Sequence, residues 1–316
     1  MEHERVMNPR DDHWRAWWVA IRPHTLPAGA APVLVGTGVA VAEGMVAWPP
    51  ALAALIGALL IQIGTNLAND YFDARHGVDT AERAGFTRVT HEGLLSPSAV
   101  WRATIGCFAA AILLGSYLVW IGGLPIVVIG LVSVICGLAY AGGPFPFGSR
   151  GLGDLFVFVF FGIVAVMGTY YVQAAAVVTN PPIWWVPPDI SWQLAFLASI
   201  PMGCLTTSIL VVNNLRDRET DRAAGKYTLA VLIGVRGSKF EYVGLLGIAY
   251  VVPAILAWQT GRLVVLLPLV TIPLAARLAV HVVGRPPDER LNLTLTRTGQ
   301  LLSAYAVLFA AGLVGV

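Results

Sequence analysis

The sequence contains few charged side chains, since Asp, Glu, Lys and Arg together make up only 12% of its 316 residues. An ordinary soluble domain has about twice that fraction. Hydrophobic residues make up 57% of the chain and the mean hydropathy is +0.72, which is more apolar surface than one soluble core of this length could bury. The scarcity of charge therefore excludes a soluble domain and a disordered chain, and it places the protein in a lipid bilayer.

The sequence also has little net positive charge and few cysteines. The 20 Lys and Arg residues nearly balance the 18 Asp and Glu residues, so the chain lacks the basic stripe that a nucleic-acid binder needs to neutralise phosphates. The three cysteines, Cys107, Cys136 and Cys204, each lie inside an apolar run and form no CxxC pair or Cys/His cluster. This excludes a disulfide scaffold, and we interpret the three as small buried hydrophobic residues.

Long stretches with few or no charges are what the sequence has instead. A membrane-spanning helix needs about 20 such residues, and the first stretch is too long for a signal peptide. We predict an all-α, polytopic membrane protein with nine transmembrane helices, in which residues 1–16 form an N-terminal arm and residues 17–316 form a single transmembrane domain. The predicted spans are 17–42, 50–72, 99–121, 124–142, 153–178, 191–214, 238–259, 263–283 and 296–315.

The positions of the basic residues predict the orientation, because Lys and Arg are retained on the cytoplasmic side of short loops. With the N-terminus in the cytoplasm and the C-terminus outside, only Arg262 of the 20 Lys and Arg residues falls on the outer side. Only Glu43 and Asp189 of the 18 acids do so. Acids contribute little to topology, so their accumulation on the cytoplasmic side needs another reason.

Two clusters of Asn and Asp at the ends of the second and sixth predicted spans supply that reason. Each has an Asn, an Asp four residues later and a second Asp three or four residues further on, which on a helix would share one face. Polar groups at membrane depth are costly and usually face a bundle interior or a watery cavity. The matching clusters indicate a loose duplication, and their members are Asn66, Asp70 and Asp73 in the first and Asn213, Asp217 and Asp221 in the second.

The oxygen-only ligands of these clusters select a hard cation, above all Mg²⁺, which prefers to be shared between one or two carboxylates and substrate phosphates. Basic residues nearby would bind a diphosphate that carries the metal. An apolar bundle around such a site suggests a substrate with a diphosphate head and a lipid tail. The bases available are Arg83, Arg88 and Lys226, with Arg75, Arg216, Arg218 and Arg222 as further candidates.

Five stretches in order carry a resemblance to a known family: 22–27, 66–80, 83–88, 151–162 and 213–230. With these stretches the chain resembles the UbiA-type superfamily of intramembrane aromatic prenyltransferases over nearly its whole length. Within it, the likeness is closest to the branch that prenylates 1,4-dihydroxy-2-naphthoate in menaquinone biosynthesis. The superfamily commonly spaces the first two acids by four residues, whereas here position 74 is Ala and the second acid is Asp73, a spacing similar to the naphthoate branch.

The resemblance implies Mg²⁺-dependent transfer of a polyprenyl group from its diphosphate to the naphthoate ring, with loss of the ring carboxylate as CO₂. It implies an active site facing the cytoplasm at the inner membrane of a bacterial or archaeal-type cell, with active-site loops at about 73–98 and 215–237. Asp70, Asp73, Asp217 and Asp221 would be the catalytic acids and would hold the metal together with Asn66 and Asn213. Arg83, Arg88, Lys226 and Tyr140 would bind the diphosphate, and Arg22 and Asp154 would bind the acceptor.

Several alternatives stay open at this point. Relatives in the superfamily use 4-hydroxybenzoate, homogentisate, haem or a glycerol phosphate as acceptor, and either Asp73 or Asp79 could complete the first metal set. Repeated halves with buried acids also describe a cation-coupled transporter, although these acids lie at the ends of spans and not at the midplane. The expected partners are membrane lipid, polyprenyl diphosphate and an aromatic acid, with no obligate protein partner. The sequence does not specify the prenyl chain length or the oligomeric state.

Overall fold

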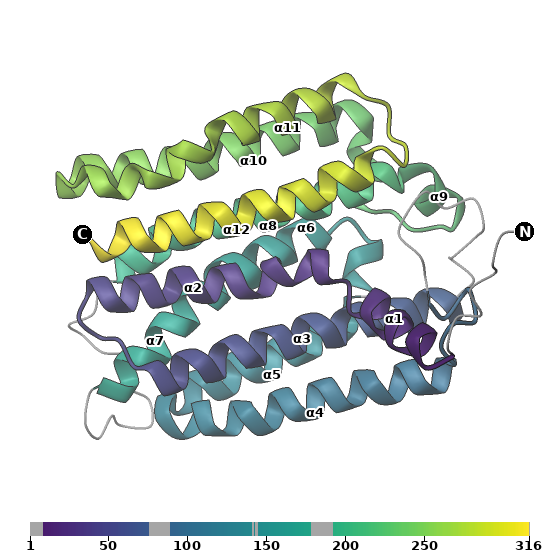
Figure 1. Ribbon diagram of the computed structural model, residues 1–316, viewed down its shortest axis with the longest axis horizontal. Helices are drawn as coiled ribbons and strands as arrows, with labels where there is room; N and C mark the ends of the chain where they lie inside the picture. The colour runs from purple at the N-terminus through teal and green to yellow at the C-terminus, as the bar shows by residue number, and fades with distance from the viewer. Residues whose placement is uncertain (1–8, 76–88, 141, 143–144, 178–191, 316) are drawn as a thin grey trace, which may run out of the picture.

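The structure, a computed structural model, describes residues 9–75, 89–140, 142, 145–177 and 192–315, with side chains from residue 13 onward. The described chain is all helical, and its long helices lie side by side in one bundle (Figure 1). The helices are α1 (Pro9–Ile21), η1 (Pro23–Thr25), α2 (Leu26–Ala42), α3 (Trp48–Arg75), α4 (Pro97–Gly122), α5 (Leu124–Ala139), η2 (Phe147–Ser149), α6 (Gly153–Val157), η3 (Phe158–Val164), α7 (Ala165–Val177), α8 (Trp192–Arg216), α9 (Arg218–Ala223), α10 (Leu229–Thr260), η4 (Leu263–Thr271), α11 (Ile272–Gly284) and α12 (Leu291–Val314).

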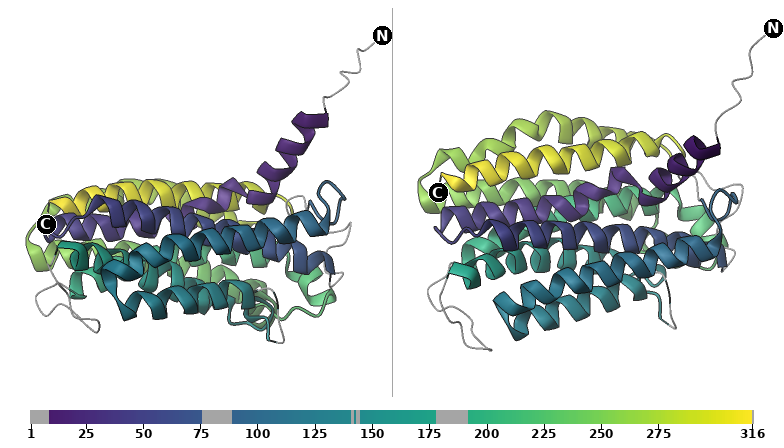
Figure 2. Two further views of the ribbon diagram at one scale, coloured as in Figure 1. Left: turned by 90° about the horizontal axis from the view of Figure 1, so that it is seen from below. Right: turned by 60° about the horizontal axis from the view of Figure 1, so that its bottom comes forward.

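Within the described residues, eight helical segments are long and apolar enough to cross a membrane, which confirms the polytopic all-α fold. The predicted fourth span corresponds to α5, which has only 16 residues. A helix of that length rises about 24 Å, less than the roughly 30 Å of a hydrocarbon core. The count of nine crossings therefore stays a prediction. The start of α1 and the end of α12 lie at opposite ends of the bundle (Figures 1 and 2), and which end faces the cytoplasm also stays a prediction.

The first predicted span is interrupted at Arg22, which has φ 55° and ψ 70° and is the one non-glycine residue of the described chain with positive φ. Pro23 follows it, and a proline disfavours the α conformation at the preceding residue. The segment therefore divides into α1 and α2, and α1 leans away from the bundle (Figure 2). Helix α1 also begins at Pro9, inside the stretch predicted to be the N-terminal arm.

Helix α8 lies at the centre of the bundle, with 78% of its most apolar window buried, and it contacts α2, α10, α12 and η3. Helices in a membrane associate through close packing at small residues, and α8 and η3 meet at two glycines. A Cβ added to Gly162 would lie only 2.7 Å from Cα of Gly203. This contact requires glycine and holds the π-helical segment η3 against the centre of the bundle.

Replacing Gly162 by Ala should lower the thermal unfolding temperature of the detergent-purified protein, because the added methyl group would push η3 away from α8. Overpacking of this kind costs about 1–3 kcal/mol. Gly168→Ala is the matched control in the same span, since its added carbon would meet only a side-chain atom of Ile129 at 3.8 Å. Equal unfolding temperatures for the two variants would contradict the tight packing of η3 on α8.

Candidate active site

A cavity of about 580 Å³ lies inside the bundle, between α2, α3, α4, α5, η3, α7 and α8. Most carboxylate, amide and ammonium groups of the lining lie at one end of the cavity, near the end of α3 and near α9, at the right of Figure 1. We call this end of the cavity the motif end. Toward the other end the lining is mostly apolar, with Val119 near the end of α4 and Ile126 near the start of α5. The cavity thus joins a polar head site to an apolar tail site. The polar residues at the motif end include Arg22, Asn66, Asn69, Asp73, Tyr140, Asn213, Asn214, Asp221, Lys226 and Thr228.

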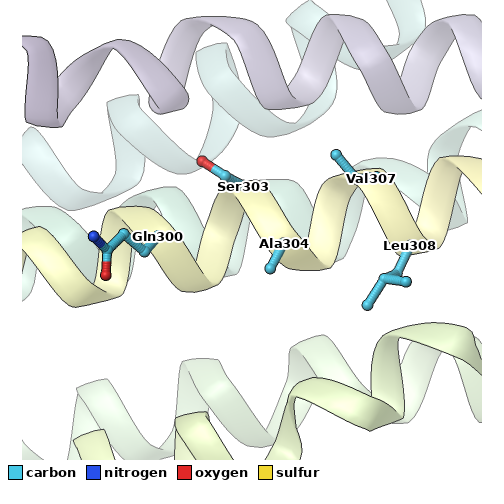
Figure 3. A pocket seen from close by; sticks show the side chains of 5 residues that line it. All are labelled: Gln300, Ser303, Ala304, Val307 and Leu308. Carbon is cyan, nitrogen blue, oxygen red and sulfur yellow. The ribbon is translucent and has the colours of Figure 1, made fainter.

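A second hollow lies on α12 and is lined by Gln300, Ser303, Ala304, Val307 and Leu308 (Figure 3). All of its lining comes from one helix and includes no acid or base. A diphosphate needs cationic or metal-binding partners, so the larger cavity is the candidate site.

The amide of Asn66 in the first cluster is oriented by the break between α1 and α2. Its Nδ2 donates hydrogen bonds to the carbonyl oxygen of Ile21 and to Thr25 Oγ1, both at 2.9 Å. Gln62 Nε2 donates to Asn66 Oδ1 at 3.3 Å and to Thr25 Oγ1 at the same distance. Because both hydrogens of the Asn66 amide are used in this way, its carbonyl oxygen is the atom left to contact a ligand in the cavity.

Asp70 is buried one turn further along α3, with 2% of its surface exposed. One carboxylate oxygen, Oδ2, accepts two hydrogen bonds from Thr90, from the backbone N–H at 3.1 Å and from the hydroxyl at 2.7 Å. Asp70 does not line the cavity. Thr90, in the segment before α4, thus contacts the first cluster and holds this carboxylate in place.

Asp73 connects the first cluster to the second. Its Oδ1 lies 2.6 Å from Lys226 Nζ, and the side chains are only 8% and 18% exposed, respectively. Both residues line the cavity. The ion pair joins the end of α3 to the connection between α9 and α10 across a separation of 153 residues. The two clusters that the sequence places far apart therefore meet at one site.

The second cluster is organised around Arg216, whose side chain is 3% exposed. Its guanidinium donates to both carboxylate oxygens of Asp217 at 2.7 Å, to Asn213 Oδ1 at 2.9 Å and to Asn292 Oδ1 of α12 at 2.7 Å. A two-pronged contact of this kind fixes the carboxylate geometrically. Arg216 thus positions the second cluster and ties it to α12.

The second cluster does not occupy one face of a continuous helix, contrary to the sequence prediction. Helix α8 ends at Arg216, and Asp221 belongs to the separate short helix α9. The backbone N–H of Asp217 still donates to the carbonyl of Asn213 at 3.1 Å, and that of Asp221 to the carbonyl of Asp217 at 2.8 Å. The break leaves Asp217 bound to Arg216, outside the cavity lining, while Asp221 lines the cavity.

Tyr140 follows the end of α5 and lines the motif end of the cavity. A tyrosine hydroxyl is protonated at physiological pH and can donate a hydrogen bond. A Cβ added to Gly153 would lie 3.3 Å from this hydroxyl oxygen, which places the hydroxyl against the start of α6.

The two predicted acceptor residues occupy different positions. Arg22 lines the cavity. Asp154 is 5% exposed and does not line the cavity, and its Oδ2 makes no hydrogen bond to any described residue. The structure thus brings Arg22 to the cavity together with Asn66, Asp73, Tyr140, Asn213, Asp221 and Lys226. Asp70, Asp154 and Asp217 lie outside the cavity lining. Arg83, Arg88 and Asp79 fall outside the described residues.

Several residues at the site were not identified from the sequence. Thr25 and Thr90 have no local pattern that marks them, since each reaches its partner through a break or loop rather than through helical spacing. Two aromatic residues, Phe156 and Phe160, also line the cavity, and their rings stack with centroids 5.8 Å apart. They offer aromatic faces between the head site and the tail site, where a cationic carbon would be stabilised.

Replacing Arg216 by Ala should destabilise the protein strongly, because it leaves the Asp217 carboxylate buried without its two guanidinium hydrogen bonds. Breaking a buried ion pair costs about 3–5 kcal/mol, measurable as a lower unfolding temperature in detergent. Arg290→Ala serves as control, since this side chain is 64% exposed and 3.9 Å from Asp288, a pair worth at most about 1 kcal/mol. If R216A unfolded at the same temperature as R290A, the positioning role of Arg216 would be wrong.

Comparison with known proteins identifies a family to which the chain is similar. Residues 30–314 match the UbiA prenyltransferase family. The chain is 38% identical to 1,4-dihydroxy-2-naphthoate octaprenyltransferase of Mycobacterium tuberculosis, covering 94% of this chain and 97% of the relative. It is 31% identical to the Haemophilus influenzae protein of the same name, covering 99% of both.

Solved structures share the fold. A UbiA homolog from Archaeoglobus fulgidus has a TM-score of 0.63 at 17% identity, covering 95% of this chain and 100% of the homolog. The structure of that homolog bound to DMAPP and Mg²⁺ has a TM-score of 0.58 at 14% identity, covering 93% and 98%. From the sequence match and the relatives above 30% identity over nearly the full length, the chain belongs to the UbiA prenyltransferase family.

Proposed function

We propose that this prenyltransferase transfers a polyprenyl group from polyprenyl diphosphate to 1,4-dihydroxy-2-naphthoate, with release of diphosphate and CO₂, to give the hydroquinone form of demethylmenaquinone. The observation that carries the proposal is the meeting of the two Asn/Asp clusters, through Lys226 and Asp73, at one end of a deep apolar cavity. A lipid diphosphate requires such a joined head and tail site. The choice of acceptor is supported by the names of relatives that match nearly the whole chain.

The residues at the motif end fit a magnesium ion that is shared with the substrate. Mg²⁺ is usually held by one or two carboxylates, substrate phosphates and retained waters, and Asp73 and Asp221 both line the cavity. Among the described residues, no group of three or more His, Cys, Asp and Glu could hold a metal by itself, which agrees with a site completed by substrate. When bound, Mg²⁺ would neutralise the diphosphate oxygens and so favour their departure.

The remaining ligands follow from the hydrogen bonds around them. Asn66 and Asn213 line the cavity together with Asp73 and Asp221, and the Asn66 amide donates both of its hydrogens to the chain, which leaves its oxygen to face a ligand. We propose that Asp70 and Asp217 complete the set, each held in place by its partner, Thr90 or Arg216. Lys226 would exchange part of its contact with Asp73 for the incoming diphosphate.

The prenyl chain would occupy the apolar part of the cavity, with its first carbons beside Phe156 and Phe160. The bond between carbon and the diphosphate oxygen breaks, and the oxygen keeps the electron pair. The developing allylic cation faces the two aromatic rings, which stabilise positive charge, and the apolar lining excludes water that would otherwise trap it.

The acceptor would bind near Arg22 and Tyr140, both of which line the motif end. Arg22 would pair with the naphthoate carboxylate, and the protonated Tyr140 would donate to an oxygen of the substrate pair. The ring carbon that bears the carboxylate forms the new bond to the prenyl carbon, and loss of that carboxylate as CO₂ returns its electron pair to the ring. The acceptor-binding role of Asp154 stays a prediction, since this residue lies outside the cavity lining. From the distribution of Lys and Arg, the motif end would face the cytoplasm.

Replacing Asp73 or Asp221 by Asn should lower prenyl transfer by about 10²–10³-fold, the usual cost of losing one group that stabilises developing charge. The measurement is incubation of membranes with labelled polyprenyl diphosphate, Mg²⁺ and 1,4-dihydroxy-2-naphthoate, with quantification of the prenylated product. Glu289→Gln, an exposed acid before α12, should keep full activity. Full activity in either cluster variant would contradict the site, and product formed only with 4-hydroxybenzoate or homogentisate would contradict the proposed acceptor.

Chelation of divalent cations with EDTA should abolish transfer, and added Mg²⁺ should restore it. EDTA alone should leave the unfolding temperature unchanged, because the described acids form no metal site without substrate. Mg²⁺ and inorganic pyrophosphate together should raise that temperature, because a ligand that binds only the folded state stabilises it. Sustained turnover in excess EDTA would rule out the metal requirement.

A further inference from the structure

We infer that Thr228 is a further binding residue for the substrate diphosphate. Thr228 is 4% exposed and lines the motif end of the cavity together with Lys226, Asp221 and Asp73. Neither the first Asn/Asp cluster nor the second includes it. The inference rests on the proposed function, because it names one more contact to the same diphosphate.

The hydroxyl of Thr228 makes no hydrogen bond within the described structure, although the atom is fully buried. Thr228 occupies the residue before α10, with φ −61° and ψ 162°, where a threonine hydroxyl ordinarily accepts a hydrogen bond from the first turn of the helix. Here the side chain makes no such bond. A buried polar group without a partner costs free energy, so an unused hydroxyl in a ligand cavity indicates that a ligand completes it.

The backbone on both sides of Thr228 is held in place. The N–H of Tyr227 donates to the carbonyl of Ser149 at 3.0 Å, and the N–H of Lys226 donates to the carbonyl of Asp221 at 2.8 Å. The Lys226 ammonium is paired with Asp73. Gly151, with φ +74°, lets the 147–151 segment approach closely, since an added Cβ would lie 2.6 Å from a methyl carbon of Leu232. These contacts position the hydroxyl before substrate arrives.

The surrounding groups favour an anionic oxygen as the partner of this hydroxyl. Asp73 and Asp221 would hold the metal ion that carries the diphosphate, and the cationic Lys226 is two residues before Thr228 in the chain. A hydroxyl that donates to a charged oxygen forms a strong hydrogen bond. Its position at the motif end, away from the apolar lining, places it on the head group and not on the prenyl chain.

The chain provides a matched control in Thr207 of α8. Thr207 is 2% exposed and its hydroxyl also makes no hydrogen bond to the described residues, but it does not line the cavity. If a buried hydroxyl without a hydrogen-bond partner affected only the stability of the protein, replacing Thr207 or Thr228 would have the same effect on ligand binding.

The test compares Thr228→Val, Thr228→Ser and Thr207→Val in the full-length purified protein. The measured quantities are the KM for polyprenyl diphosphate, the KM for the acceptor, and the dissociation constant of inorganic pyrophosphate with Mg²⁺. We expect T228V to raise the KM for polyprenyl diphosphate and the pyrophosphate dissociation constant about tenfold, the effect of one hydrogen bond to a charged group. The KM for the acceptor should be unchanged, and T228S and T207V should match the wild-type protein.

An unchanged pyrophosphate dissociation constant in T228V would overturn the inference, as would an equal rise in T207V. Thr228→Ala replaces the valine variant if the latter does not fold, as judged by its unfolding temperature, and carries the same expectation. Pyrophosphate binding is measured without any acceptor, so it separates the two claims. If the wild-type protein bound pyrophosphate with Mg²⁺ but prenylated no aromatic acid, the proposed function would be wrong. The assignment of Thr228 would then still be decided by the pyrophosphate dissociation constant of T228V.

Discussion

The ion pair between Lys226 and Asp73 is the contact on which the site depends. It joins the end of α3 to the segment that follows α9, so the two Asn/Asp clusters share one cavity. Both side chains are largely buried, and a charge removed from water needs an opposite charge nearby. The pair thus fixes the end of α3 relative to the segment that carries the second cluster.

The other buried acids are also compensated by partners, but the partners differ. Asp70 receives two hydrogen bonds from Thr90, and Asp217 receives two from Arg216. These acids are fixed by their partners, while Asp73 and Asp221 line the cavity. Asp70 and Asp217 are thus compensated by Thr90 and Arg216, and Asp73 by Lys226, before a ligand binds.

Much of this arrangement could be predicted from the sequence, because it depends on composition and spacing. Apolar stretches of membrane length located the helices, and the matched Asn/Asp spacing located both clusters. The break at Asp217 could not be predicted, since the spacing of Asn213, Asp217 and Asp221 fits an uninterrupted helix equally well. Nor could the roles of Thr25 and Thr90, because each contacts its partner across the chain at separations of 41 and 20 residues. Spacing identifies residues that share an element, whereas contacts between elements depend on how helices pack.

The most direct measurement of the central claim, that both clusters hold one diphosphate, is a double-mutant cycle on binding of inorganic pyrophosphate with Mg²⁺. The variants are Asp73→Asn, Asp221→Asn and the two together. Residues that hold the same bound group lose affinity in a strongly non-additive way. The account predicts that the double variant binds no more weakly than the weaker single variant. Losses that simply add would contradict it, because additive losses are the behaviour of two separate sites.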